Sequence, residues 1–182
     1  LGLSMGSGAL FSIYIGEKST EKLKSAIGQA FTLIAAVTAV LNVLLYAFID
    51  PILSFLQIPE TLYADMREYL IIIFAGIAAT FLYNFFACLL RAAGNSASPL
   101  IFLAVSALLN IALDLWFVLG LNFGIAGAAA ATVISQYVSG IGLLLFTIFR
   151  EKKLLPERKH FKPNRKILRE LFDLSFLTCA QQ

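Results

Sequence analysis

Residues 92–149 read AAGNSASPLIFLAVSALLNIALDLWFVLGLNFGIAGAAAATVISQYVSGIGLLLFTIF, and the only charged side chain among them is Asp114. A membrane-spanning helix needs about 20 mostly apolar residues to cross a hydrocarbon core of ~30 Å, so this stretch is long enough for two. The segment GLNFG at 120–124 lies between the two halves and is typical of a turn. The stretch therefore predicts a hairpin of two transmembrane helices.

The rest of the chain has the same character. Apolar residues make up 59% of the sequence and charged residues 14%, with a mean hydropathy of +0.84, whereas a soluble domain usually carries about 25% charged residues. Windows free of Asp, Glu, Lys and Arg also lie at 25–49 and 69–90. The sequence predicts an all-α fold, a polytopic bundle of transmembrane helices at about 1–16, 26–49, 66–90, 96–119, 125–149 and 166–182.

Cysteine and histidine usage indicates neither a disulfide framework nor a metal site. Cys88 and Cys179 lie in apolar helical stretches, where small packing residues are expected. His160 stands alone in a basic loop, so we expect a solvated histidine. The chain begins inside a hydrophobic segment without an initiator Met and ends within a predicted helix, so we expect it to be part of a longer protein.

The basic residues are distributed unevenly over the segments that connect the helices. Thirteen of the 14 Lys and Arg residues fall in segments that should share one side of the membrane, and nine of these lie between 150 and 169. The segments expected on the other side contain a single basic residue, Arg67. By the positive-inside rule the basic side is cytoplasmic. The sequence thus predicts a cytoplasmic linker at 151–165 and external loops at 50–65 and 120–124, and its net charge of +3 requires no nucleic-acid partner.

Asp114 is the leading candidate for a functional residue, because an ionisable side chain inside a membrane is costly. Asn110 lies one turn earlier on the same helical face. If the hairpin folds symmetrically about its turn, Thr132 lies at the depth of Asp114, and Gln136 at the depth of Asn110. A carboxylate, a carboxamide and a hydroxyl are hard oxygen ligands, suited to Na⁺ or a proton. We therefore expect a cation- or proton-binding site in the outer half of the membrane.

The alternative is that these polar residues only hold helices together, as Asn, Gln and Thr often do in membranes. Both roles stay open for Asn110, Thr132 and Gln136 taken singly. For Asp114 function is favoured, because a buried acid is a costly way to join two helices.

Tyr69 begins a second polar stripe, which continues through Gly76, Thr80 and Asn84 on the preceding predicted helix. This stripe either lines a pore or serves packing. Tyr69 itself is also interpretable as an interface anchor, because aromatic residues gather where a helix leaves the membrane.

Three stretches resemble motifs of the multidrug and toxic compound extrusion (MATE) family. LRAAGN at 90–95, followed by Pro99, resembles the family's Leu-Arg-Ala-x-Gly-(Asp/Asn) loop with its downstream proline. NIALD at 110–114 resembles its Asn-x-x-Leu-Asp helix. GIAGAA at 124–129, followed by Ala-Thr at 131–132 and Ser-Gln at 135–136, resembles its Gly-x-x-Gly-Ala-Ala…Ala-Thr…Ser-Gln helix.

The resemblance implies a twelve-helix transporter built from two six-helix lobes. Residues 1–150 would belong to the amino-terminal lobe, residues 151–165 would be the interlobe linker, and residues 166–182 would begin helix 7 of the second lobe. Many members have a helix-7 proline near the position of Leu177, so a bend is not implied there.

The resemblance also implies a function. Related members have a cation or proton site that would correspond to Asn110, Asp114, Thr132 and Tyr69, together with an acid on helix 1 that this chain lacks. The implied protein is not an enzyme but a monomeric antiporter in the cell membrane, in contact with lipid. It would export small organic, often cationic, compounds in exchange for Na⁺ or H⁺, with no cofactor. The alternative is a lipid-linked oligosaccharide flippase of the same wider superfamily, which would be expected to place basic residues in the membrane.

Overall fold

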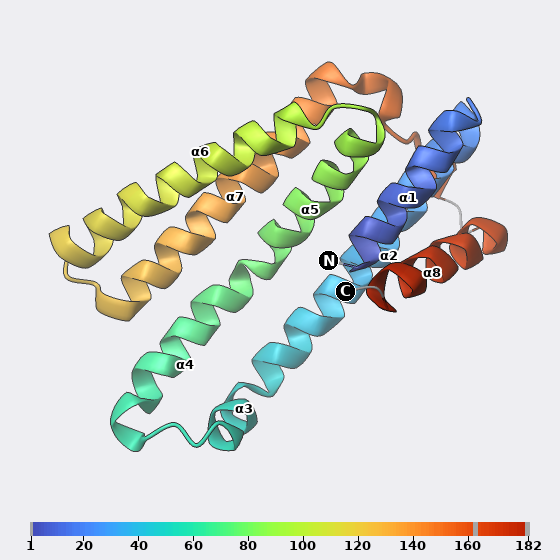
Figure 1. Ribbon diagram of the computed structural model, residues 1–182. Coiled ribbons are helices and arrows are strands. Elements are labelled where there is room, and N and C mark those ends of the chain that lie inside the picture. Colours follow the sequence, from blue (N-terminus) through green and yellow to red (C-terminus); the bar gives the residue numbers. More distant parts are fainter. Residues whose placement is uncertain (1, 162–163, 181–182) are drawn as a thin grey trace.

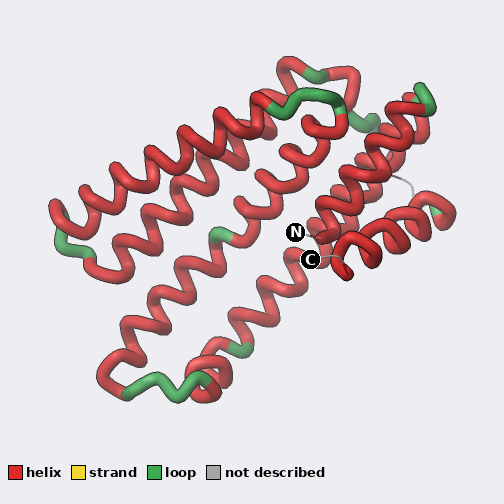
Figure 2. The backbone as a smooth tube through the Cα atoms, viewed as in Figure 1, coloured by secondary structure: helices red, strands yellow, loops and turns green. Residues whose placement is uncertain are grey.

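The computed structural model describes residues 2–161 and 164–180, and within these ranges the chain forms helices and short connections without a strand (Figure 1, Figure 2). Leu115–Gly120 form a π-helix, and Lys152–Leu154 and Arg158–Phe161 form 3₁₀ turns. The prediction of an all-α fold is confirmed. The α-helices are α1 (Gly2–Gly16), α2 (Thr20–Ala47), α3 (Ile49–Phe55), α4 (Glu60–Ala75), α5 (Ile77–Ala92), α6 (Ala97–Asp114), α7 (Gly124–Arg150) and α8 (Arg165–Ala180).

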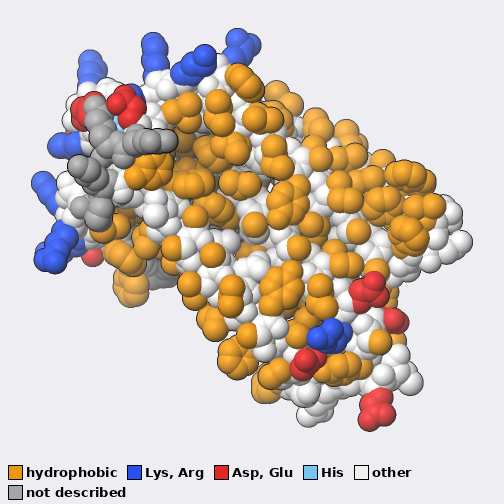
Figure 3. Space-filling model, turned by 180° about the vertical axis from the view of Figure 1, so that it is seen from behind, with side chains coloured by type: hydrophobic (Ala, Val, Ile, Leu, Met, Phe, Trp, Pro, Cys, Tyr) orange, Lys and Arg blue, Asp and Glu red, His pale blue; other side chains and the backbone are white. Residues whose placement is uncertain are grey.

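Within the described residues, four helical segments are long and apolar enough to cross a membrane: Thr20–Ala47, Glu60–Ala92, Ala97–Gly120 and Gly124–Arg150. Many of their apolar side chains face outward, as Leu108 of α6 does with 69% of its surface exposed. Figure 3 shows hydrophobic side chains across most of one face, with Lys and Arg gathered at one end and mainly Asp and Glu at the other. An apolar belt between two charged ends fits a lipid bilayer, and the chain is a multi-pass membrane protein.

The predicted hairpin is present as α6 and α7, which run antiparallel and side by side, while α5 packs along the other side of α7 (Figure 1). Small residues let these helices approach. A Cβ atom on Gly140 of α7 would lie 2.8 Å from the carbonyl oxygen of Ala79 on α5. On the α6 side, the Ser106 hydroxyl donates to the carbonyl of Ser135 at 2.8 Å. Close backbone contact of this kind stabilises helix pairs in membranes, where the hydrophobic effect does not.

The buried core lies where α1, α2 and α5 meet. The Phe85 ring of α5 stands edge-on to Phe31 of α2, with centroids 5.3 Å apart, and to Phe11 of α1 at 6.0 Å. Such edge-to-face pairs are the favoured arrangement of aromatic rings. On its other side α1 packs against α8 so closely that a Cβ on Gly6 would lie 2.5 Å from Cα of Ser175.

The predicted helix limits are correct near the hairpin and wrong at several other ends. Helix α2 starts at Thr20 rather than near 26, because its charged first residues are good helix formers that extend the helix beyond its apolar part. Helix α4 starts at Glu60 rather than near 66, and α3 occupies part of the predicted 50–65 loop. The last predicted helix starts at Arg165, and its residues 181–182 lie outside the described ranges.

Candidate functional site

Asp114 is the last residue of α6, where the chain passes from an α-helix into the π-helix of Leu115–Gly120. The amide of Leu121 donates to the carbonyl of Trp116 at 3.0 Å, a bond that spans five residues instead of four. π turns are rare and occur often at functional sites. The amino-acid composition of this run gives no sign of the wider turn, so the sequence did not predict it.

The Asp114 side chain is half-buried, and its Oδ1 atom is buried without a hydrogen-bond donor among the residues that the structure describes. An unpaired buried acceptor is destabilising in any protein interior, and more so where hydrocarbon excludes water. A carboxylate in this position is therefore suited to taking up a proton or a cation.

The α6–α7 hairpin brings two of the predicted site residues together. The Asn110 side-chain amide donates to the Thr132 hydroxyl at 3.4 Å. The Thr132 hydroxyl in turn donates to the carbonyl of Ala128 at 3.0 Å. The polar faces of the two helices thus meet, and Asp114 lies one turn beyond Asn110 on the same helix.

The predicted register of the hairpin is wrong by one turn. Asn110 was expected to face Gln136, and it faces Thr132 instead. A π-helix has more residues per turn than an α-helix and so advances less per residue. The π-helix shortens the end of α6 and so accounts for part of this shift. The rest arises because the turn between Gly120 and Gly124 is centred on residue 122, whereas the predicted pairs are centred on 123.

Gln136 points toward a different helix. Its Oε1 atom accepts a hydrogen bond from the Thr80 hydroxyl of α5 at 3.2 Å. The sequence had grouped Thr80 with Tyr69 in a polar stripe, but had not connected that stripe to Gln136. Tyr69 lies half-buried on α4, and in the described part of the chain no hydrogen bond joins it to Asp114, Asn110 or Thr132. Its place in the site stays a prediction.

The oxygen atoms gathered here limit the ion that the site could hold. The candidate residues offer one carboxyl group, that of Asp114, and the neutral oxygens of Asn110 and Thr132. Hard oxygen donors of this kind match Na⁺ or H⁺ rather than soft transition metals. The described residues contain no group of three His, Cys, Asp or Glu side chains that could hold a metal ion.

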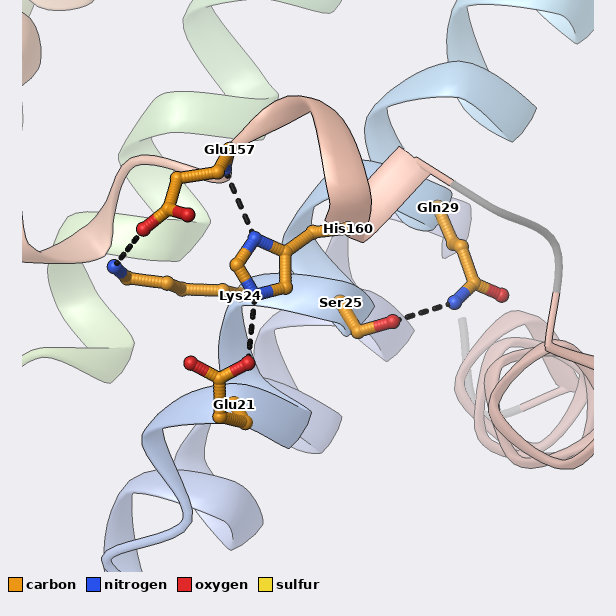
Figure 4. Close-up of polar contacts among 6 residues, drawn as sticks. All are labelled: Glu21, Lys24, Ser25, Gln29, Glu157 and His160. Atoms are coloured by element: carbon orange, nitrogen blue, oxygen red, sulfur yellow. Dashed lines mark hydrogen bonds and ion pairs between the residues drawn. The ribbon is translucent and has the colours of Figure 1, made fainter.

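The loop after α7 holds a second polar cluster, centred on His160 (Figure 4). The amide of Glu157 donates to Nδ1 of His160 at 3.0 Å, so Nε2 carries the ring hydrogen and donates to the Glu21 carboxylate of α2 at 3.1 Å. His160 is only 4% exposed. The expectation of a solvated loop histidine is wrong, because the loop folds back onto α2 and covers the ring.

Further bonds tie the same loop to α2. Lys24 forms an ion pair with Glu157 at 3.4 Å, and the amide of Asn164 donates to Oε1 of Gln29 at 2.9 Å. The segment predicted as a polar linker is therefore packed against the bundle. These contacts concern anchoring and leave the Asp114 region as the candidate ion site.

Comparisons with known proteins point to one family. The MatE family model matches residues 1–116. The probable multidrug resistance protein YoeA of Bacillus subtilis is 31% identical over 175 residues, which cover 92% of this chain and 38% of that protein. The probable multidrug resistance protein NorM of Thermotoga maritima is 26% identical over 183 residues, which cover 98% of this chain and 39% of that protein.

Solved structures show the same fold. An inward-facing multidrug resistance MATE family transporter superposes with a TM-score of 0.90 at 21% identity, over 97% of this chain and 40% of its own. An outward-facing one superposes with a TM-score of 0.86 at 22% identity, over 98% of this chain and 41% of its own. The chain thus spans about two fifths of the length of the proteins it matches.

Proposed function

This chain belongs to the MatE family, and we propose that it is part of a secondary active antiporter that exports organic, often cationic, compounds in exchange for Na⁺ or H⁺. The main support is Asp114, the sole charged side chain of residues 92–149, whose buried Oδ1 has no donor in the described part of the chain. The adjacent Asn110–Thr132 pair adds neutral oxygen ligands. The similar proteins named multidrug resistance proteins support the class of substrate.

In this proposal residues 1–150 belong to the amino-terminal lobe, residues 151–165 link the lobes, and residues 166–182 begin helix 7 of the second lobe. Two lobes that rock against each other would expose a site between them to one side of the membrane at a time. Ion binding at Asp114 drives this exchange only if the two states differ in their affinity for the ion. The Asp114 carboxylate supplies that difference when one state pairs it with an ion and the other leaves it uncompensated.

The decisive experiment measures transport of a cationic dye by the intact protein in vesicles under imposed Na⁺ or pH gradients. We expect one of the gradients to drive transport by the native protein, and Asp114→Asn to abolish driven transport while the protein stays folded and inserted. The amide keeps the shape of the side chain but cannot bind a proton or balance a cation. Gradient-driven transport by Asp114→Asn at the native rate would remove Asp114 from the mechanism.

The orientation is tested separately. We propose that the basic end of the bundle faces the cytoplasm, because 13 of the 14 basic residues belong to its segments. A cysteine at the exposed Lys152 position should resist an impermeant thiol reagent in intact cells, whereas one at the exposed Thr61 position should react. The opposite labelling pattern would invert the orientation.

A further inference from the structure

One membrane-spanning segment, Glu60–Ala92, is divided at its middle. Helix α4 ends at Ala75 and α5 begins at Ile77, with Gly76 between them; Figure 2 shows a loop at this point of an otherwise continuous helical path. The Gly76 amide donates to the carbonyl of Ile73 at 2.9 Å, a bond that tightens the last turn of α4. The segment contains no proline after residue 59, so the interruption has another cause.

Side chains of two other helices bind the carbonyls of α4 that precede the break. From α2, the Asn42 amide donates to the carbonyl of Phe74 at 2.7 Å. From α7, the Tyr137 hydroxyl donates to the carbonyl of Ala75 at 2.9 Å. Donors of this kind compensate an interrupted helix where hydrocarbon provides none. The break is therefore supported from both sides.

Helix α7 also presses directly on Gly76. A Cβ atom at this position would lie 2.8 Å from Oε1 of Gln136 and 3.0 Å from Cγ2 of Val133. A larger residue at position 76 would therefore require the Gln136 and Val133 side chains of α7 to shift. A pocket of about 570 Å³ beside the break, lined in part by Asn42 of α2, Ala75 of α4 and Tyr137 of α7, leaves room for these helices to move.

The Thr80 hydroxyl, just after the break, can form either of two hydrogen bonds. It has one hydrogen and two acceptors at nearly equal distances, the carbonyl of Gly76 at 3.1 Å and Oε1 of Gln136 at 3.2 Å. Donation to the first reinforces the start of α5, and donation to the second ties α5 to α7. Because the two distances are nearly equal, a shift of α7 away from α5 would favour the Gly76 carbonyl as the acceptor.

From these contacts we infer that Gly76 is a hinge between α4 and α5, and that Gln136 and Tyr137 connect this hinge to the ion site. Thr132, which binds Asn110, lies one turn before Gln136 on α7, so an ion that moves Thr132 also moves the two residues that hold the hinge. Gln136 and Tyr137 are then positioning residues, which set the angle between α4 and α5 without binding the ion. The inference rests on the proposed function.

The first test uses Gly76→Ala in the intact transporter, with Gly16→Ala as the matched control, because a Cβ on Gly16 would meet nothing within 4 Å. Spin labels at Thr61 and Arg91, both exposed, report the distance across the hinge with and without the coupling ion. We expect the ion to change this distance by about 2 Å or more in the native protein and in Gly16→Ala, and not in Gly76→Ala. The transport rate at saturating substrate should fall roughly tenfold in Gly76→Ala with a KM within about threefold of native.

The second test removes only one hydroxyl, in case Gly76→Ala fails to fold. Tyr137→Phe should reduce both the distance change and the saturating rate, whereas Tyr83→Phe, which loses a similar bond to the carbonyl of Pro99, should reduce neither. Native behaviour of Tyr137→Phe, or equal losses in the two variants, would overturn the hinge. Asp114→Asn distinguishes the hinge from the proposed function. If Asp114→Asn loses driven transport while Gly76→Ala and Tyr137→Phe behave as the native protein does, the hinge alone is refuted. If Asp114→Asn transports normally, the proposed function is refuted.

Discussion

The α6–α7 hairpin and the loop after α7 differ in how fully their polar side chains are hydrogen-bonded. In the hairpin a single carboxylate, Asp114, has an oxygen without a donor among the described residues, and the Asn110 amide bonds to the Thr132 hydroxyl at 3.4 Å. In the loop, His160 is bonded through both ring nitrogens and lies beside an ion pair of Lys24 with Glu157. The hairpin exposes apolar side chains along its outer face, whereas the loop lies at the end of the bundle where Lys and Arg gather (Figure 3).

This difference indicates that the free-energy cost of an unpaired polar group in this protein depends on its distance from water. Coulomb interactions grow as the surroundings become less polar, and a charge in hydrocarbon is costly. The same substitution should therefore have its largest effect in the middle of the belt, an intermediate effect at the packed loop, and the smallest effect on the exposed ends.

The largest effect is expected for a charge placed on the lipid-facing side of α6. Leu108→Lys, at a side chain that is 69% exposed near the middle of the helix, should cost about 2.5–3.5 kcal/mol of insertion free energy. Leu62→Lys, at the acidic end of α4, should be tolerated. The yield of folded protein extracted from membranes measures both. Equal yields would mean that the exposed face of α6 does not lie in lipid.

An intermediate effect is expected at the packed loop. His160→Phe keeps a ring of similar shape but removes the acceptor of the Glu157 amide and the donor to Glu21, which should cost about 1–3 kcal/mol. Protease cleavage within residues 151–161 should become faster, and the unfolding temperature should fall. The exposed Lys152→Ala serves as the control. Unchanged cleavage of His160→Phe would show that the ring does not anchor the loop.

A smaller effect is expected for the bond between Asn110 and Thr132. Hydrogen bonds between membrane helices average ~0.6 kcal/mol, so a double-mutant cycle of Asn110→Leu and Thr132→Val should give a coupling of about that size. The matched cycle of Asn110→Leu with Gln136→Leu should give none, because Gln136 bonds to Thr80. Coupling to Gln136 in place of Thr132 would restore the symmetric register.

The smallest effect is expected at the acidic end. Its Asp50–Arg67 pair is exposed on both sides, and the hydrogen bond from Arg67, with a second from Tyr63, holds the pKa of Asp50 below its ordinary value of 3.8. A lowered pKa means that the pair contributes fully above the ordinary value and is lost as the pH falls through the lowered one. Asp50→Asn should therefore barely change the unfolding temperature near neutral pH. As the pH is lowered, the unfolding temperature of this variant should fall slightly less than that of the native protein. A large change at neutral pH would contradict solvent screening of this pair.

Much of the fold could be predicted from the sequence because the bilayer acts on properties of single segments. A span needs a certain length of apolar residues, and the stretch from 92 to 149 satisfied that requirement twice around a recognisable turn. The same reasoning singled out Asp114, since a lone charge in such a stretch stands out in one dimension. Asn110 and Thr132 could also be named, because helical spacing puts them on the faces that meet.

What the sequence by itself determined is therefore the membrane class, the α6–α7 hairpin and the candidate residues along it. Only the tertiary structure decided that Asn110 faces Thr132, that Gln136 turns to Thr80, that the segment from 60 to 92 breaks at Gly76, and that His160 is buried. The physical reason is that each of these depends on contacts between residues distant in the chain or on the exact rise of a turn. Apolar length and charge are properties of one segment, whereas register and burial are properties of segments packed together.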